Sequence, residues 1–127
     1  MTPTQTKILA VLRTADHPLS AYDVLAVLRE TQPKAGPPTA YRGLQKLIDA
    51  GLAHRLESIN AYIACRLDHS KAPTAYAICD DCGRVSEHTG EAITAQLTAA
   101  ARDGGFEPSR AVVELHGTCR DCRGQSN

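Results

Sequence analysis

The chain has 127 residues, with 14 Lys plus Arg against 14 Asp plus Glu, so its formal charge is zero. This balance argues against a uniformly basic nucleic-acid coat and against an acidic disordered tail. The length suits one compact domain or two small ones, and with 43% hydrophobic but only 4% aromatic residues each half would have a thin core. Because the sequence shows neither an apolar run of about 18 to 20 residues nor a signal-peptide layout, we expect a cytoplasmic protein without a membrane partner.

Two helices with clear start signals are predicted at the beginning of the chain. Residues 2–14 begin with Thr2 as an N-cap and Gln5 as its capping-box partner, followed by apolar residues at helical spacing. A second helix is predicted to start at Ser20, with Asp23 at the third helical position.

A third helix and a β-hairpin are predicted to complete a first domain. The helix is expected to begin at Thr39 and to end at Gly51, a residue suited to a left-handed C-terminal cap, with Leu44 and Leu47 facing inward. Short strands are expected over residues 52–56 and 61–65. Three helices followed by a hairpin are typical of a winged helix-turn-helix domain, which we place at residues 1–65.

The remainder of the chain has a different pattern. Residues 66–74 are polar and contain a proline, so they are predicted to form a hinge. Residues 75–127 are predicted to form a small α/β domain, which makes the fold class α+β. Its expected elements are strands at 75–78, 84–88 and 111–116 and a helix at 89–102 with Ile93 and Leu97 inward.

The zero net charge conceals two unlike parts. Residues 1–60 contain seven Lys and Arg against five Asp and Glu, whereas residues 61–127 contain seven against nine. A mildly basic helix-turn-helix segment suits DNA binding, and the acidic remainder suits cation binding or assembly.

Four of the five cysteines form two CxxC pairs. Cys79 and Cys82 make one pair, and Cys119 and Cys122 make the other. Four thiolates at about 2.3 Å around one zinc ion form a closed tetrahedral site, so the pairs predict structural zinc. The alternative is a redox dithiol, which normally requires one pair at a helix N-terminus.

The fifth cysteine, Cys65, is accompanied by further metal-ligand types. His54 is expected on the facing strand, His69 follows four residues later, and Glu87 and His88 lie just beyond the first CxxC pair. Taken singly, such a histidine is usually solvated and such a cysteine is usually a small buried hydrophobe. Together, one thiolate with imidazoles and a carboxylate favours a second, regulatory zinc site at the hinge.

Six segments of the sequence resemble the ferric uptake regulator family, and most closely its zinc uptake regulator subgroup. The most specific run extends from His54 through Glu57, Ser58 and Asn60 to Cys65. The six segments are SAYD at 20–23, PPTAYR at 37–42, GLAHRLES at 51–58, NAYIAC at 60–65, CDDCG at 79–83 and HGTC at 116–119.

The resemblance implies a winged-helix domain hinged to a dimerisation domain, acting as a homodimer on palindromic operator DNA. It assigns structural zinc to the four cysteines of the CxxC pairs. It also implies a regulatory zinc site, for which the ligands are His54, Cys65, His69 and Glu87, with His88 and His116 as alternatives.

The resemblance also implies which residues contact DNA. Tyr41 and Arg42 match the family's recognition-helix pair, where the arginine can bind either a guanine edge or a phosphate. Lys46 and Arg55 are expected to contact phosphates. Where relatives often have Thr-Pro-Gln-Arg, this chain has the sequence TPTQ at residues 2–5 and lacks the arginine, so we expect fewer backbone contacts.

These observations predict a zinc-responsive DNA-binding repressor of zinc-uptake genes, with two zinc ions per chain. An iron or peroxide sensor of the same family is the first alternative, and Cys65 argues against it. A thiol oxidoreductase using Cys79 and Cys82 is the second. The sequence contains no Ser-His-Asp array, phosphate-binding loop or catalytic carboxylate pair, so we expect no enzymatic activity and no small-molecule substrate.

Overall fold

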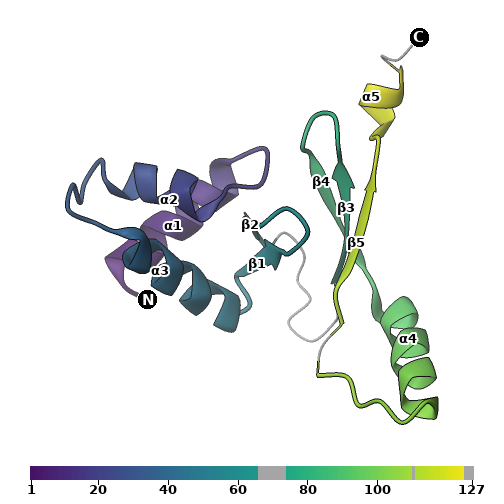
Figure 1. Cartoon of the computed structure of the whole chain (residues 1–127). Coiled ribbons are helices and arrows are strands. Elements are labelled where there is room, and N and C mark those ends of the chain that lie inside the picture. Colours follow the sequence, from purple (N-terminus) through teal and green to yellow (C-terminus); the bar gives the residue numbers. More distant parts are fainter. Residues whose placement is uncertain (66–73, 110, 125–127) are drawn as a thin grey trace. The chain divides into compact units, whose positions relative to one another are not determined.

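The computed structural model describes residues 1–65, 74–109 and 111–124, and the chain divides into two units, Met1–Arg66 and Leu67–Asn127. Both units combine helices with a small β-sheet (Figure 1), which confirms the α+β fold class. The predicted hinge lies outside the described residues except for Thr74, which begins a strand. In the part of the chain that is described, no helix is long and apolar enough to cross a membrane.

Both helix starts predicted near the beginning of the chain are confirmed. Helix α1 spans Pro3–Thr14, and the Thr2 hydroxyl accepts a hydrogen bond from the Gln5 backbone N–H at 3.1 Å. Helix α2 spans Ala21–Leu28, with the same reciprocal capping box between Ser20 and Asp23. These caps satisfy backbone N–H groups that would otherwise lack partners at the helix start.

Helix α3 spans Pro37–Asp49, so it begins two residues earlier than predicted. The reason is that proline at the first helical position has no N–H to satisfy and its fixed φ already suits a helix. The predicted cap at Gly51 is confirmed, because this residue has φ +77°. The N–H groups of Gly51 and Leu52 donate to the carbonyls of Ile48 and Leu47, which completes a Schellman motif.

The predicted hairpin is formed by β1, Ala53–Leu56, and β2, Ala61–Ala64, which pair antiparallel. Asn60 adopts φ +50° in the turn. Leu19 and Tyr62 exchange both backbone hydrogen bonds, at 3.0 and 2.7 Å, and thereby attach the hairpin to the segment before α2. The first unit is therefore a winged helix-turn-helix.

The core of the first unit is built from the inward faces of α1, α2 and α3. Its largest fully buried side chains are Ile8, Leu12, Val24, Leu28, Leu44 and Leu47. Gly43 lies in α3 against α1, and a Cβ added to this glycine would overlap Cδ1 of Ile8. The tip of the Ile8 side chain thus occupies the space that a side chain at position 43 would take.

We expect Gly43→Ala to lower the free energy of unfolding by about 1 kcal/mol. Overpacking a core costs about 1 to 3 kcal/mol, which exceeds the roughly 0.5 to 1 kcal/mol gained in helix propensity. Ile8→Val removes the overlapping methyl group, so the double variant should be more stable than the sum of the single changes by about 1 kcal/mol. Urea unfolding of the four proteins measures this coupling, and additive changes would contradict the contact.

The second unit contains a three-stranded sheet in the order β4-β3-β5. Strand β3, Thr74–Cys79, pairs antiparallel with β4, Val85–Thr89, and parallel with β5, Val113–Gly117. Helix α4, Glu91–Asp103, follows β4 and precedes β5, as a parallel connection requires. A short helix α5, Arg120–Gly124, ends the described chain and was not predicted.

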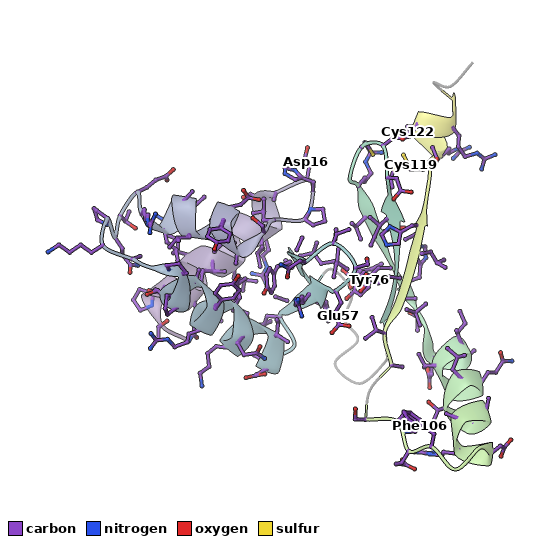
Figure 2. The ribbon with its side chains drawn as sticks, in the orientation of Figure 1. Asp16, Glu57, Tyr76, Phe106, Cys119 and Cys122 are labelled. Atoms are coloured by element: carbon purple, nitrogen blue, oxygen red, sulfur yellow. The ribbon has the colours of Figure 1, made fainter. Side chains whose placement is uncertain are left out.

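The prediction that Ile93 and Leu97 face inward is wrong. Their exposed fractions are 50% and 56%, and the buried residue of α4 is instead Thr94, whose hydroxyl donates to the Gly90 carbonyl at 2.9 Å. Phe106, beyond the end of α4 (Figure 2), is 65% exposed. The helical periodicity identified an apolar face correctly, but in the single chain that face is open to solvent.

Candidate metal centres and nucleic-acid interface

The second unit brings the four cysteines of the CxxC pairs together. Cys79 ends β3 and Cys82 lies in the turn before β4, whereas Cys119 precedes α5 and Cys122 lies within it. The four sulfur atoms all lie within 4.8 Å of one another, and the sulfurs of Cys82 and Cys119 are 3.8 Å apart. Figure 2 shows Cys119 at the start of α5 and Cys122 in this helix, near the loop that joins β3 to β4.

Local backbone geometry explains why the first pair forms a compact loop. Gly83 has φ +77°, a conformation that side chains other than glycine rarely adopt. Its N–H donates to the Cys79 carbonyl at 3.0 Å, and the Cys79 N–H donates to the Arg84 carbonyl at 2.9 Å. The residue after the first pair of cysteines therefore needs a positive φ, which accounts for glycine in the CDDCG segment.

The parallel register of β3 and β5 brings the second pair to the first. Cys79 lies opposite Gly117 in the register, and the Asp80 N–H donates to the Gly117 carbonyl at 2.8 Å. Only Thr118 then separates the end of β5 from Cys119. Cysteines about 40 residues apart in sequence thus meet at one end of the sheet.

The polar surroundings favour the thiolate form of one member of this cluster. Backbone N–H groups of Cys82 and Cys119 lower the pKa of Cys79 to about 6, and the Cys119 N–H lies 3.3 Å from the Cys79 sulfur. The pKa of Cys122 is raised, chiefly through its hydrogen bond with Cys119. Four converging sulfurs with N–H donors fit a tetrahedral zinc ion, which takes thiolates as its ligands.

The hairpin of the first unit brings together two further candidate ligands. His54 lies opposite Ile63 in the register of β1 and β2, and Cys65 follows Ile63 by two residues on the same face. The ligand atoms of His54 and Cys65 lie within 4.8 Å of each other, and both residues are half-buried. An imidazole and a thiolate at this separation can bind one zinc ion together.

The other candidate ligands of the predicted regulatory site lie elsewhere in the chain. Glu87 is half-buried on β4, opposite Tyr76 on β3. His88 Nε2 lies 2.8 Å from the Ser86 hydroxyl, and His116 Nδ1 lies 3.2 Å from a carboxylate oxygen of Asp80. His69 lies outside the described residues.

The predicted DNA-contacting residues lie on α3 and on the adjacent strand β1. Tyr41, Arg42 and Lys46 are exposed on α3, and Arg55 is exposed on β1. Within the first unit, residues of both elements line a groove of about 500 Å³. It is lined by Tyr41, Arg42, Gln45, Ile48, Arg55, Asn60 and Tyr62.

One contact in this groove was not anticipated from the sequence. Asn60 Oδ1 accepts hydrogen bonds from both Nε and Nη2 of Arg55, at 3.3 and 2.9 Å. The side chain of the turn residue thereby orients a cation of the wing. The sequence feature that pointed to Asn60 was its position in the turn of the hairpin, where asparagine tolerates a left-handed backbone.

Comparison with known families explains this combination of a winged helix and paired metal-ligand clusters. A sequence profile of the ferric uptake regulator family matches residues 1–116. The chain belongs to the ferric uptake regulator family. Among its relatives, the zinc uptake regulation protein of Escherichia coli (strain K12) is 39% identical over 123 residues, covering 96% of this chain and 72% of the relative.

Two further comparisons place the chain within this family. A solved structure of a zinc uptake regulator complexed with zinc and DNA superposes with a TM-score of 0.92 at 38% identity, covering 98% of this chain and 83% of that one. The ferric uptake regulation protein of Escherichia coli (strain K12) is 32% identical over 122 residues, covering 92% of this chain and 80% of the relative. The resemblance inferred from the sequence is thus confirmed, and the two zinc regulators described here are more similar to this chain than this iron regulator is.

Proposed function

We propose that this member of the ferric uptake regulator family is a zinc-responsive DNA-binding repressor that controls zinc-uptake genes. The observation that carries the proposal is the similarity, over nearly the whole chain, to zinc uptake regulators, one of them complexed with zinc and DNA. The family consists of regulators rather than enzymes. The thiol oxidoreductase alternative is therefore set aside.

The first zinc ion per chain is proposed to be structural, with Cys79, Cys82, Cys119 and Cys122 as its ligands. The convergence of the four sulfurs at one end of the sheet supports this role. Such an ion would fasten the end of β5 and α5 to the loop after β3. Because an unfolded chain has no preformed site, zinc binding at these cysteines contributes to the free energy of folding.

The second zinc ion is proposed to be regulatory, with His54, Cys65, His69 and Glu87 as its ligands. The proximity of His54 and Cys65 on one face of the hairpin supports the first two. His88 and His116 are the alternatives to His69. Because these ligands come from both units, zinc binding would restrain the orientation of the DNA-binding unit. The site can act as a switch only if zinc binds more tightly in the DNA-competent arrangement than in the other.

We propose that a homodimer binds palindromic operator DNA through α3 and the wing. Tyr41 and Arg42 would contact bases or phosphates, and Lys46 and Arg55 would contact phosphates. Homodimerisation is supported by apolar side chains that the second unit exposes. These side chains are Ile93, Leu97, Phe106, Val112 and Leu115, with exposed fractions of 48% to 65%.

The test is a zinc count combined with operator binding. We expect two zinc ions per wild-type chain and one per Cys65→Ser chain, because a site that has lost its thiolate and keeps three of its four ligands binds zinc weakly. Operator affinity of the wild type should rise at least tenfold as zinc fills the second site, a difference of about 1.4 kcal/mol. Elemental analysis and fluorescence anisotropy measure these two quantities.

The outcomes separate the zinc sensor from an iron or peroxide sensor. Equal operator affinity with the second site empty and filled would contradict the switch. Selective filling of that site by ferrous iron in a competition with zinc would support an iron or peroxide sensor instead. The chain is also 32% identical to a ferric uptake regulation protein, so this alternative is tested directly. Cys82→Ser is the contrasting variant: it should also hold one zinc ion, but its defect should appear as a lower free energy of unfolding, whereas Cys65→Ser should keep its stability and lose the zinc response.

A further inference from the structure

An ion pair joins the two cysteine loops of the second unit. Arg84 follows the first loop, and Asp121 lies between Cys119 and Cys122 in the second. Arg84 Nη1 donates to Asp121 Oδ2 at 2.8 Å, and the two side chains are 62% and 66% exposed. Neither residue is a candidate zinc ligand, so their pairing requires a separate explanation.

The electrostatics of the cluster indicate what this pair does. Four thiolates around one Zn²⁺ leave two net negative charges, and the Asp121 carboxylate adds another nearby. The hydrogen bond to Asp121 is the main cause that raises the pKa of Arg84, followed by the charges of Asp121, Cys82 and Cys119. Arg84 also lines the same pocket as Cys79 and Cys119.

We propose that Arg84, held in place by Asp121, slows zinc release from the four-cysteine site, because its positive charge offsets the negative charge of the thiolates. This inference rests on the proposed structural zinc site. The guanidinium remains protonated at every physiological pH. It therefore stabilises the thiolate cluster whether or not neighbouring groups titrate.

The effect should be modest and should depend on salt. An exposed ion pair typically shifts an equilibrium by about 1.5- to 5-fold, and ions screen it strongly above about 1 M salt. We therefore expect Arg84→Gln to raise the rate of zinc release about two- to fivefold at 50 mM NaCl. The difference should nearly vanish at 1 M NaCl.

Another ion pair of the same unit provides a matched control. Arg102 Nη2 donates to Glu107 Oε1 at 2.9 Å, with side chains 58% and 74% exposed, so its geometry and exposure resemble those of the first pair. Arg102 lies in the last turn of α4, and the described residues that line a pocket with it include no cysteine. Arg102→Gln should therefore leave zinc release unchanged.

The experiment compares the zinc-loaded wild-type chain with Arg84→Gln, Arg84→Lys and Arg102→Gln. A colorimetric chelator gives the rate of zinc release at 50 mM and 1 M NaCl. Mass spectrometry after iodoacetamide treatment gives the alkylation rate of Cys82 and Cys119 and thus reports on this site alone. We expect faster release and faster alkylation in Arg84→Gln, and near-wild-type rates in Arg84→Lys, which keeps the charge.

Three outcomes would overturn the proposal. Equal rates in Arg84→Gln and Arg102→Gln would show that the charge has no effect. A rate increase that is the same at both salt concentrations and in Arg84→Lys would show that Arg84 acts through packing instead. A wild type that holds no zinc at the four cysteines would overturn the structural site and this inference with it.

Discussion

Cys119→Ser is expected to lower the free energy of unfolding by about 3 kcal/mol or more and the Tm by roughly 10 to 20 °C. The reason is that the second unit has little else to hold its sheet edge and α5. Among its described residues, the buried hydrophobic ones are Ala75, Tyr76, Ile78 and Cys79, and α5 has none. Scanning calorimetry with and without a zinc chelator measures the effect.

Cys65→Ser is the matched control for this change, because it replaces a half-buried thiol outside the four-cysteine cluster. It should retain one zinc ion and lose less than about 1 kcal/mol of stability. Treating the wild type with excess chelator, which removes both zinc ions, should lower the Tm at least as far as Cys119→Ser does. If Cys119→Ser melted and dimerised like the wild type, the structural role of the cluster would be contradicted.

Local signals were sufficient to predict most of the first unit. The capping boxes at Thr2 and Ser20 and the Schellman motif at Gly51 act within a few residues of the elements they bound. Such short-range interactions are encoded where they occur, so a sequence displays them directly. The early start of α3 at Pro37 was missed because a proline pair is equally compatible with a turn.

The second unit was less predictable because its determinants are not local. The two CxxC pairs predicted a shared zinc site, but the assembly of that site depends on the parallel register that places Cys79 opposite Gly117. The inward orientation expected for Ile93 and Leu97 was wrong because periodicity identifies an apolar face without specifying what covers it. In a homodimer, the missing cover would be a second copy of the chain.

The proposed DNA-binding surface depends on both local helix periodicity and the register of the hairpin. Helical spacing places Tyr41, Arg42 and Lys46 on the exposed side of α3, and the hairpin register adds Arg55 beside them. The hydrogen bonds from Arg55 to Asn60 restrict the wing cation before any DNA is bound. Restricting a long side chain in advance lowers the entropy cost of binding.

Arg42→Ala is expected to weaken operator binding by about 30-fold or more. A good arginine–guanine pair contributes about 1 to 3 kcal/mol, and a homodimer would use two of them. Arg42 is exposed on α3, and its Nε donates to the Pro38 carbonyl at 3.4 Å, so its loss should leave the helix folded. Fluorescence anisotropy with zinc-saturated protein measures the change, and Arg102→Ala in the second unit is the matched control.

The salt dependence of the same measurement identifies what Arg42 contacts. If it binds a guanine edge, Arg42→Ala should lose discrimination against operators substituted at one base pair and keep the wild-type salt slope. If it binds a phosphate, binding should weaken on all sequences and the slope of log K against log salt should fall by about 0.9 for each copy. Operator affinity equal to that of Arg102→Ala would contradict a DNA contact at this position, and with it the assignment of α3 as the recognition helix.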